Sequence, residues 1–240
     1  MTNVMNITQH DMEYVYAGQD KILLAVDCVV FGFDSKEIKL LLFKRKVAPL
    51  KGEWSLIGSF IKNDMSLEDS AQRVLNESTG LDNVFFEELK TYSNVNRDPG
   101  ARVISVAYYS LIRLNDMNKE SVEKYDARWF GLNEIPELIL DHGDMVRLAI
   151  ERLKVKVRRR PVGFNLLPEK FTLPQLQILY ESIYQRKVDD RNFRKKILSF
   201  DILTKTEEKD KSNSRKGAFY YKFNKDKFDE FVANGYNFEL

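Results

Sequence analysis

The sequence has almost no cysteine and no long apolar run. Cys28 is the only cysteine among the 240 residues, so an intrachain disulfide and a metal site built from several thiolates are both excluded. No apolar stretch approaches the roughly 18 to 20 residues that cross a bilayer, and the first 20 residues lack the basic-then-apolar order of a secretion signal. We therefore expect a soluble, cytoplasmic protein that has no membrane partner, with Cys28 buried and inert.

Net charge is also small, at +2 for the whole chain, but the charge is unevenly distributed. Residues 1–150 hold 17 Lys/Arg and 23 Asp/Glu, a net charge of −6. Residues 151–222 hold 19 and 9, a net charge of +10, and the last 18 residues hold 2 and 4. The length and the 43% hydrophobic content suit two domains. Separation of the basic charge into one segment favours a polyanionic partner such as nucleic acid.

The first part of the chain combines strand patterns with one clear helix. "ILLAVDCVVFGF" and "IKLLLFKRK" flank the turn "DSKE" and predict a hairpin. "FFEELKTYSNV", "RVISVAYYSLI" and "ARWFGL" predict further strands, and the helix lies between the two sets. This order predicts an α+β protein whose N-terminal domain, residues 1–155, is an α/β/α sandwich.

The second domain is predicted from a helix, a short link, a second helix and a strand pair. A helical pattern leads into "RRRPVGFNLLPEK", which predicts a linker at 156–168. Then follow "FTLPQLQILYESIYQRKV", the link "DD" with a capping aspartate, "RNFRKKILSF", and the strands "DILTKT" and "AFYYKF" around "TEEKDKSNSRKG", which we expect to be a mobile loop. This order is typical of a winged helix-turn-helix, here residues 169–240.

The basic helix of this domain has a polar face that suits double-stranded DNA. Phe193 and Ile197 are expected to face the core, so the polar residues between them face outward. Arginine or lysine suits guanine and asparagine suits adenine in the major groove. The residues expected to contact bases are Arg191, Asn192 and Lys195, and those expected to contact phosphates are Arg194, Lys196, Arg215 and Lys216.

The helix at 66–80 has a distinctive pattern, "SLEDSAQRVLNESTGL". Ser66 can cap its start and Gly80 its end. Together with the preceding "GEWSLIGSFIKND", the stretch resembles the Nudix box, in which glutamates at i, i+3 and i+4 hold magnesium against a diphosphate. The positions that match the four box glutamates are Met65, Val74, Glu77 and Ser78, and the position of the box glycine is Ser59. With one carboxylate of four, we expect no hydrolase activity, no bound metal and no cofactor.

A Nudix-like domain with a degenerate box followed by a winged helix resembles the Nudix-related transcriptional regulators. The resemblance rests on "KRKVAPLKGEWSLIGSFI", "RVLNESTGL", "NRDPGARVISVAYYSLI" and "FTLPQLQILYESIYQRKVDDRNFRKKIL". It implies a repressor that binds a palindromic operator as a homodimer. One branch senses ADP-ribose and regulates NAD synthesis. Another senses a pentose such as L-arabinose in Bacteroides-like bacteria, and the sequence "DCVVFGFDSKEIKLLLFKR" favours that branch.

The effector is expected in the former catalytic cleft. The residues predicted to bind it are Arg45, Trp54, Ser55, Glu77, Asp98, Arg102 and Tyr108. His10 and His142 have no ligand spacing and are interpreted as surface or loop residues. Two alternatives stay open. One is a divergent Nudix hydrolase that uses Glu77 with Glu87, Glu88 or Asp98, and the other is a protein-interaction module with a basic segment.

Overall fold

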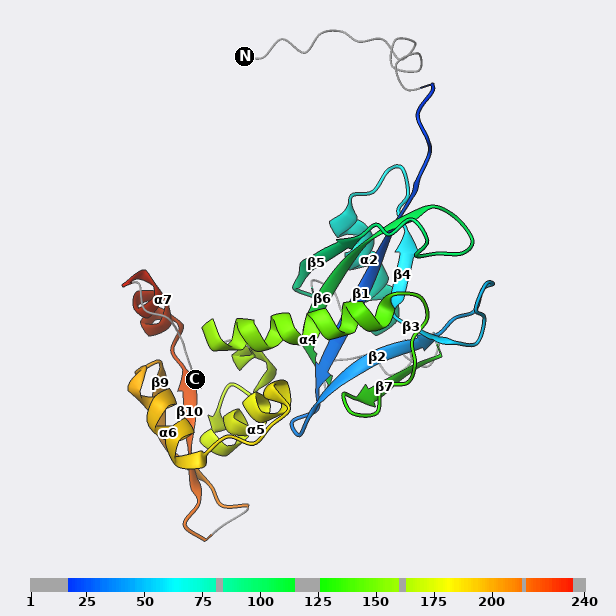
Figure 1. Ribbon diagram of the computed structural model, residues 1–240. Coiled ribbons are helices and arrows are strands. Elements are labelled where there is room, and N and C mark those ends of the chain that lie inside the picture. The colour runs from blue at the N-terminus through cyan, green and yellow to red at the C-terminus, as the bar shows by residue number, and fades with distance from the viewer. Residues whose placement is uncertain (1–16, 81–83, 115–125, 160–162, 213–214, 235–240) are drawn as a thin grey trace, which may run out of the picture.

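The computed structural model describes residues 17–80, 84–114, 126–159, 163–212 and 215–234 (Figure 1). In these ranges, no helix combines the length and the apolar character needed to cross a membrane. His10 lies outside the described residues. The chain folds into an N-terminal sheet domain and a C-terminal helical domain that are joined by one long helix, coloured light green in Figure 1.

The N-terminal domain is built on a seven-stranded mixed sheet. Its strands are β1 (Leu23–Phe33), β2 (Ile38–Lys44), β3 (Trp54–Ser55), β4 (Ile57–Phe60), β5 (Phe86–Tyr92), β6 (Val103–Arg113) and β7 (Ala127–Gly131). The main order is β3-β2-β1-β6-β5, with β4 paired to β1 and β7 paired to β2. Only the central β1–β6 pair among these is parallel. The predicted hairpin is confirmed as β1 and β2.

A helix covers each face of this sheet (Figure 1). Helix α2 (Leu67–Thr79) packs on one face through Ala71 and Leu75, and helix α4 (His142–Arg159) packs on the other. Adjacent residues of a strand point to opposite faces, so Tyr108 lies under α2 and Tyr109 under α4. The α/β/α sandwich predicted from the sequence is therefore confirmed.

The C-terminal domain is a winged helix, as predicted. It contains the short 3₁₀ helix η2 (Phe164–Leu166), strand β8 (Phe171–Thr172), helices α5 (Leu173–Tyr184) and α6 (Asp190–Ser199), strands β9 (Leu203–Asp210) and β10 (Ala218–Phe223), and helix α7 (Lys225–Ala233). The strands form a sheet in the order β8-β10-β9. Thr172 and Gln175 form a capping box at the start of α5. Asp189 caps α6 by accepting the Asn192 N–H, as expected from the "DD" link.

Two expectations about this domain need correction. The polar stretch that begins at Thr206 is predicted to be a loop, but β9 extends into it as far as Asp210. The strand pairs with β10 through backbone hydrogen bonds, and its solvent-facing side needs no apolar residues. Helix α4 also continues to Arg159, past residue 156 where the linker was expected to begin. The domain limits 1–155, 156–168 and 169–240 otherwise stay a prediction.

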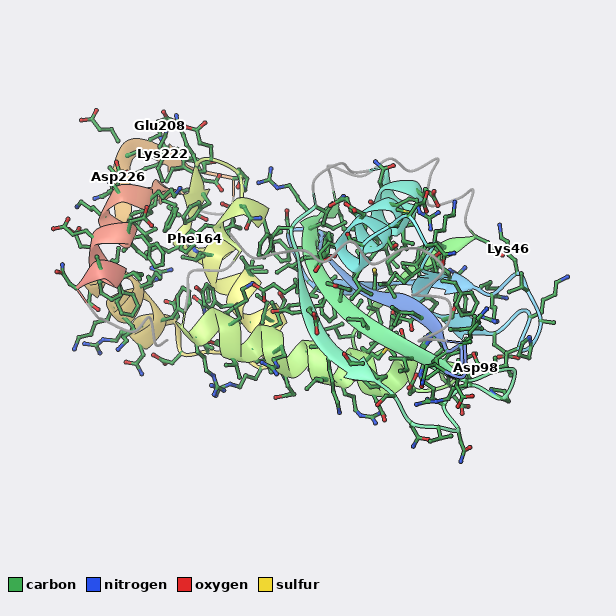
Figure 2. The ribbon with its side chains drawn as sticks, turned by 90° about the horizontal axis from the view of Figure 1, so that it is seen from above. Lys46, Asp98, Phe164, Glu208, Lys222 and Asp226 are labelled. Carbon is green, nitrogen blue, oxygen red and sulfur yellow. The ribbon has the colours of Figure 1, made fainter. Side chains whose placement is uncertain are left out.

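The two domains share one hydrophobic cluster and a polar clamp. The cluster runs from the α4 side of the sheet through α4 and η2 into α5 and α6. Phe164, labelled in Figure 2, stacks on Phe223 with ring centroids 4.4 Å apart. Arg113, at the end of β6, donates hydrogen bonds to the carbonyl oxygens of Asn165, Leu166 and Leu167. The N-terminal sheet therefore directly contacts the first turn of the winged helix domain.

Candidate functional site

A cavity of about 450 Å³ opens between β1, β2, β4, α2 and the start of α4. Three consecutive cations line it at the end of β2 and just beyond, namely Lys44, Arg45 and Lys46. Acidic side chains come from three other elements, with Asp27 on β1, Glu77 on α2 and Asp98 before β6. The volume lies within the range that holds a small-molecule ligand. Cations and hydrogen-bond acceptors therefore line the same open cavity.

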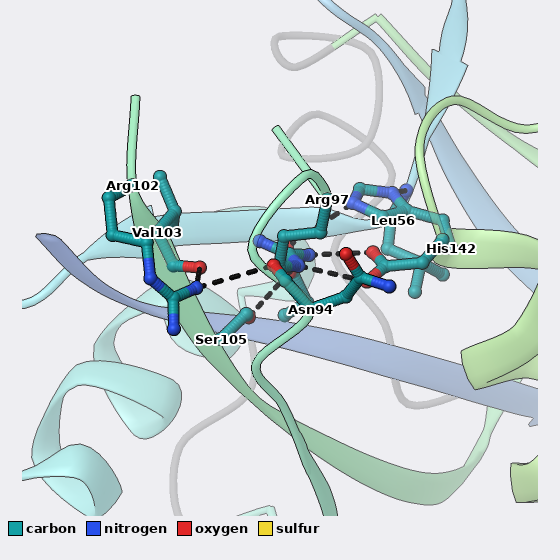
Figure 3. A network of polar contacts seen from close by, with 9 residues as sticks. Leu56, Asn94, Arg97, Arg102, Val103, Ser105 and His142 are labelled. Carbon is teal, nitrogen blue, oxygen red and sulfur yellow. Dashed lines mark hydrogen bonds and ion pairs between the residues drawn. The ribbon is translucent and has the colours of Figure 1, made fainter. Parts of the chain in front are cut away.

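The floor of this cavity is a buried polar network (Figure 3). Arg97 binds Asp141 with both arms of its guanidinium group, Nε to Oδ2 at 2.8 Å and Nη2 to Oδ1 at 2.7 Å. Its Nη2 also lies 3.6 Å from Oδ2 of Asp27, which accepts the Ser105 hydroxyl at 2.6 Å. Burial alone would lower the pKa of Arg97, but Asp141 and Asp27 raise it. The guanidinium is therefore a fixed positive charge beneath the cavity.

His142 belongs to the same network, which corrects its interpretation as a surface or loop residue. Only 4% of the residue is exposed. Its Nδ1 accepts the backbone N–H of Leu56 at 3.0 Å, so the ring proton is on Nε2, which lies 3.7 Å from Oδ1 of Asp27. Burial lowers the pKa of His142 more than the nearby carboxylates raise it. The imidazole is therefore neutral at neutral pH.

The box helix α2 begins and ends as predicted, with Ser66 as N-cap and Gly80 in the left-handed conformation. Arg73 donates to the Ser59 hydroxyl at 3.0 Å and lies 3.4 Å from Glu77. The residues at the other two helical box positions, Val74 and Ser78, are buried and carry no charge. Among the described residues, no group of three or more His, Cys, Asp or Glu side chains could hold a metal ion. The lone Glu77 does not fit the magnesium site that a Nudix box implies.

Four of the seven predicted effector residues line the cavity. They are Arg45, Ser55, Glu77 and Asp98. The other three do not. Trp54 packs edge-on against Phe130, and Arg102 donates to the carbonyl oxygens of Ser93 and Asn94 (Figure 3). Tyr108 is 2% exposed beneath α2.

The predicted effector-binding set does not include Asp27, Arg97 and His142, which also line the cavity. Asp27 is the one charged residue within the apolar strand β1. Arg97 lies in the loop between β5 and β6, and the sequence does not predict the path of that loop. Their hydrogen-bond partners lie far away along the chain, so no local spacing could have revealed them. A polar residue inside an otherwise apolar strand is the one signal that the sequence offered, at Asp27.

The predicted DNA-binding residues are exposed on α6 and at the tip between β9 and β10. Phe193 and Ile197 are buried, as expected. The polar residues of α6 are all exposed, namely Arg191, Asn192, Arg194, Lys195 and Lys196. Arg215 and Lys216 are exposed at the tip between β9 and β10. One further feature was not predicted: Phe219 has the Lys205 and Lys209 ammonium groups 3.6 Å and 4.3 Å from its ring centroid.

Comparison with known proteins identifies both domains. Residues 21–149 match the family described as "NUDIX domain", and residues 163–223 match "NrtR DNA-binding winged helix domain". The chain is 29% identical over 202 residues to the "ADPR responsive transcriptional repressor NtrR" of Acinetobacter baylyi, which covers 82% of this chain and 81% of that protein. It is also 33% identical over 118 residues to the ADP-ribose pyrophosphatase of Methanocaldococcus jannaschii, covering 49% of this chain and 69% of that enzyme.

A solved structure resembles nearly the whole chain. The crystal structure of Shewanella oneidensis NrtR with a 27mer DNA is 30% identical, covers 86% of this chain and 95% of that chain, and has a TM-score of 0.71. These relatives do not support the pentose branch that the sequence favoured, because the Acinetobacter repressor is described as responsive to ADP-ribose. The chain belongs to the Nudix family and, within it, to the NrtR-like proteins in which a winged helix domain follows the Nudix domain.

Proposed function

We propose that this protein is a transcriptional repressor that binds operator DNA through α6 and responds to ADP-ribose bound in the Nudix cavity. The observation that carries the proposal is the exposed polar face of α6 in the winged helix domain. This domain follows a Nudix domain whose cavity is large enough for a small-molecule ligand. The described relatives that span most of the chain include a repressor and a protein crystallised with DNA.

The DNA-binding part rests on charge and geometry. The segment 151–222 carries a net charge of +10, which supplies salt-dependent attraction to phosphates. Within α6, Arg191 and Lys195 are one turn apart on the exposed side, opposite the buried Phe193 and Ile197. A helix with this arrangement can lie in the major groove and direct donors to guanine. We propose base contacts for Arg191, Asn192 and Lys195, and phosphate contacts for the cations that flank them.

The effector assignment rests on the composition of the cavity. Lys44, Arg45 and Lys46 lie together at one side and suit a negatively charged diphosphate. Asp98 and Asp27 can accept hydrogen bonds from sugar hydroxyl groups. A neutral pentose would leave the three cations without an anionic partner in the ligand. Together with the ADP-ribose response described for the Acinetobacter repressor, this supports ADP-ribose over the pentose.

We propose that bound ADP-ribose is not hydrolysed. Hydrolysis of a diphosphate by a Nudix enzyme depends on magnesium held by several carboxylates. On α2, Val74 and Ser78 stand where two of these carboxylates would be needed, and both side chains are buried against the sheet. The third position, Glu77, is engaged with Arg73. The site therefore suits recognition without turnover.

A homodimer on a palindromic operator completes the proposal. A single winged helix makes few base contacts, so two copies on adjacent half-sites raise the affinity by effective concentration. The mass of the DNA-free protein and of its operator complex, measured by light scattering, tests this part. One chain per operator at saturation would refute it.

The primary test is a fluorescence-anisotropy titration of labelled DNA from upstream of the protein's own locus, with and without ADP-ribose. We expect tight, salt-dependent binding to this DNA, weaker binding to scrambled DNA, and a changed affinity when ADP-ribose is present. L-arabinose serves as the negative control. Equal affinity for operator and scrambled DNA would refute sequence-specific regulation.

The second candidate function is a Nudix hydrolase, favoured by the 33% identity to an ADP-ribose pyrophosphatase and by Glu77 and Asp98 sharing the cavity. The other acids considered for this role do not line the cavity: Glu87 binds Tyr109 and Lys156, and Glu88 is also absent from the lining. Chromatographic detection of AMP from ADP-ribose with magnesium or manganese tests it. Turnover that disappears in Glu77→Gln would establish the hydrolase and overturn our proposal of recognition alone.

A further inference from the structure

The first turn of α4 is tethered by groups that line the effector cavity or bind directly to it (Figure 3). Arg97 holds Asp141, the residue before α4, through two hydrogen bonds of 2.8 Å and 2.7 Å. His142, the first residue of α4, accepts the Leu56 N–H at 3.0 Å and faces Asp27 at 3.7 Å. Arg97, His142, Leu56 and Asp27 all line the cavity. A ligand in the cavity therefore contacts the groups that fix the start of this helix.

The other end of α4 contacts the winged helix domain. The helix has 18 residues, which corresponds to a length of about 27 Å at 1.5 Å per residue. Near its C-terminal end, the Arg158 guanidinium lies 5.8 Å from the centre of the Tyr184 ring at the end of α5. A tilt of about 5° at the cavity would displace the far end by roughly 2 Å. One continuous helix thus links the effector cavity to the DNA-binding domain (Figure 1).

We infer that Asp141 is a positioning residue that couples occupancy of the cavity to DNA affinity, acting through Arg97. The inference rests on the proposed function, since it requires an anionic effector and DNA binding. The anionic ligand attracts the Arg97 guanidinium toward the cavity and competes with Asp141 for it. When that ion pair opens, the first turn of α4 is released and the winged helix shifts.

Because Arg97 is buried, its guanidinium has two distinct pairing states, one with Asp141 and one with the anionic ligand. Its side chain is only 3% exposed, and a buried guanidinium needs an anionic partner. Asp141 supplies both of the short hydrogen bonds, whereas the nearest oxygen of Asp27 is 3.6 Å away. Arg97 therefore leaves Asp141 only when a second anion arrives. Such differential contact of the ligand with two states is what allosteric coupling requires.

The test compares Asp141→Asn with a matched control in the first turn of α4, Asp144→Asn. Both variants remove one carboxylate charge, but Asp144 is exposed and pairs with Arg147 at the surface. ADP-ribose affinity is measured by calorimetry without DNA, and operator affinity is measured by fluorescence anisotropy with and without ADP-ribose. For the wild type and Asp144→Asn we expect ADP-ribose to change operator affinity by about 5- to 150-fold, the usual range of coupling.

For Asp141→Asn we expect that change to fall below about twofold. Its affinity for ADP-ribose should equal or exceed that of the wild type, because Arg97 is already released. A merely destabilised protein would instead bind ADP-ribose more weakly. Arg97→Lys, which keeps the charge but loses the two-pronged contact, should also lose the coupling, and circular dichroism verifies that each variant is folded.

Three results would overturn the inference. An Asp141→Asn variant that responds to ADP-ribose like the wild type would show that the ion pair does not transmit the signal. Loss of coupling in Asp144→Asn as well would show that any change in this part of α4 has the same effect. A wild type that binds operator without responding to ADP-ribose would refute the proposed effector itself, and the inference would fail with it.

Discussion

Arg113 provides the sharpest test of how the two domains are joined. Its guanidinium lies at the end of β6 and donates to three consecutive carbonyl oxygens of the winged helix domain, at Asn165, Leu166 and Leu167. We predict that Arg113→Met, which keeps most of the aliphatic stem, detaches the first turn of the winged helix from the sheet. The matched control is Arg147→Met, because Arg147 is exposed on α4 and pairs with Asp144.

The expected loss of stability follows from the burial of the acceptors. Leu166 and Leu167 are 2% and 3% exposed, so water cannot readily replace Arg113 at their carbonyl groups. Asn165 is exposed, and its bond contributes little because water competes for the carbonyl. A hydrogen bond from a charged donor contributes about 1.5 to 3 kcal/mol, so losing the two buried ones should cost about 3 to 6 kcal/mol. The control should change the stability by less than about 0.5 kcal/mol.

Urea unfolding followed by two probes measures this effect. The two tryptophans, Trp54 and Trp129, both lie in the Nudix domain, so their fluorescence reports that domain, whereas far-ultraviolet circular dichroism reports both domains. The shared hydrophobic cluster predicts coincident transitions for the wild type. In Arg113→Met, part of the dichroism change should precede the fluorescence change. Coincident transitions with a shift no larger than that of Arg147→Met would refute the clamp.

Three further predictions follow from the described contacts. Lys195→Ala should weaken operator binding and reduce the preference for operator over scrambled DNA, because a base contact is lost; Lys154→Ala, beside Glu151 on α4, should change neither. Burial lowers the pKa of His142 from its ordinary value of 6.5. The nearby carboxylates of Asp27 and Asp141 raise this pKa, whereas the positive charges of Arg97 and Arg45 lower it further. The unfolded chain therefore takes up a proton before the folded one, and the stability present above pH 6.5 declines as the pH falls below it. Thermal melting should detect a weaker pH dependence in His142→Gln, and an unchanged one would contradict the assignment. Burial raises the pKa of the Cys28 thiol, so a thiol reagent should label it only after unfolding; rapid labelling of the folded protein would contradict this.

The fold could be predicted from the sequence because its signals are local. The apolar runs that became β1, β2 and β6 alternate with turns, and the caps of α2 and α6 are encoded by Ser66 and Asp189. The extension of β9 was missed because its residues are mostly polar. Its pairing with β10 depends on backbone hydrogen bonds, which polar side chains permit and hydrophobic periodicity does not reveal.

The cavity could be predicted only in part. Glu77 lies on the box helix, Ser55 lies on β3, and Arg45 and Asp98 lie in loops next to strands of the same sheet. The resemblance therefore placed these four residues near the cavity. The ion pair between Arg97 and Asp141 joins residues 44 positions apart. Contacts of this kind depend on the tertiary fold, and neither residue has a neighbour in sequence that would indicate its partner.

The central claim is that this Nudix domain recognises ADP-ribose without hydrolysing it and transmits its binding to the winged helix. The most direct measurement is operator affinity of the full-length protein by fluorescence anisotropy over a titration of ADP-ribose with magnesium, with chromatographic analysis of the nucleotide at the end. We predict a saturable change in operator affinity while the ADP-ribose remains intact. Quantitative conversion to AMP, or an operator affinity that does not change at any ADP-ribose concentration, would contradict the account.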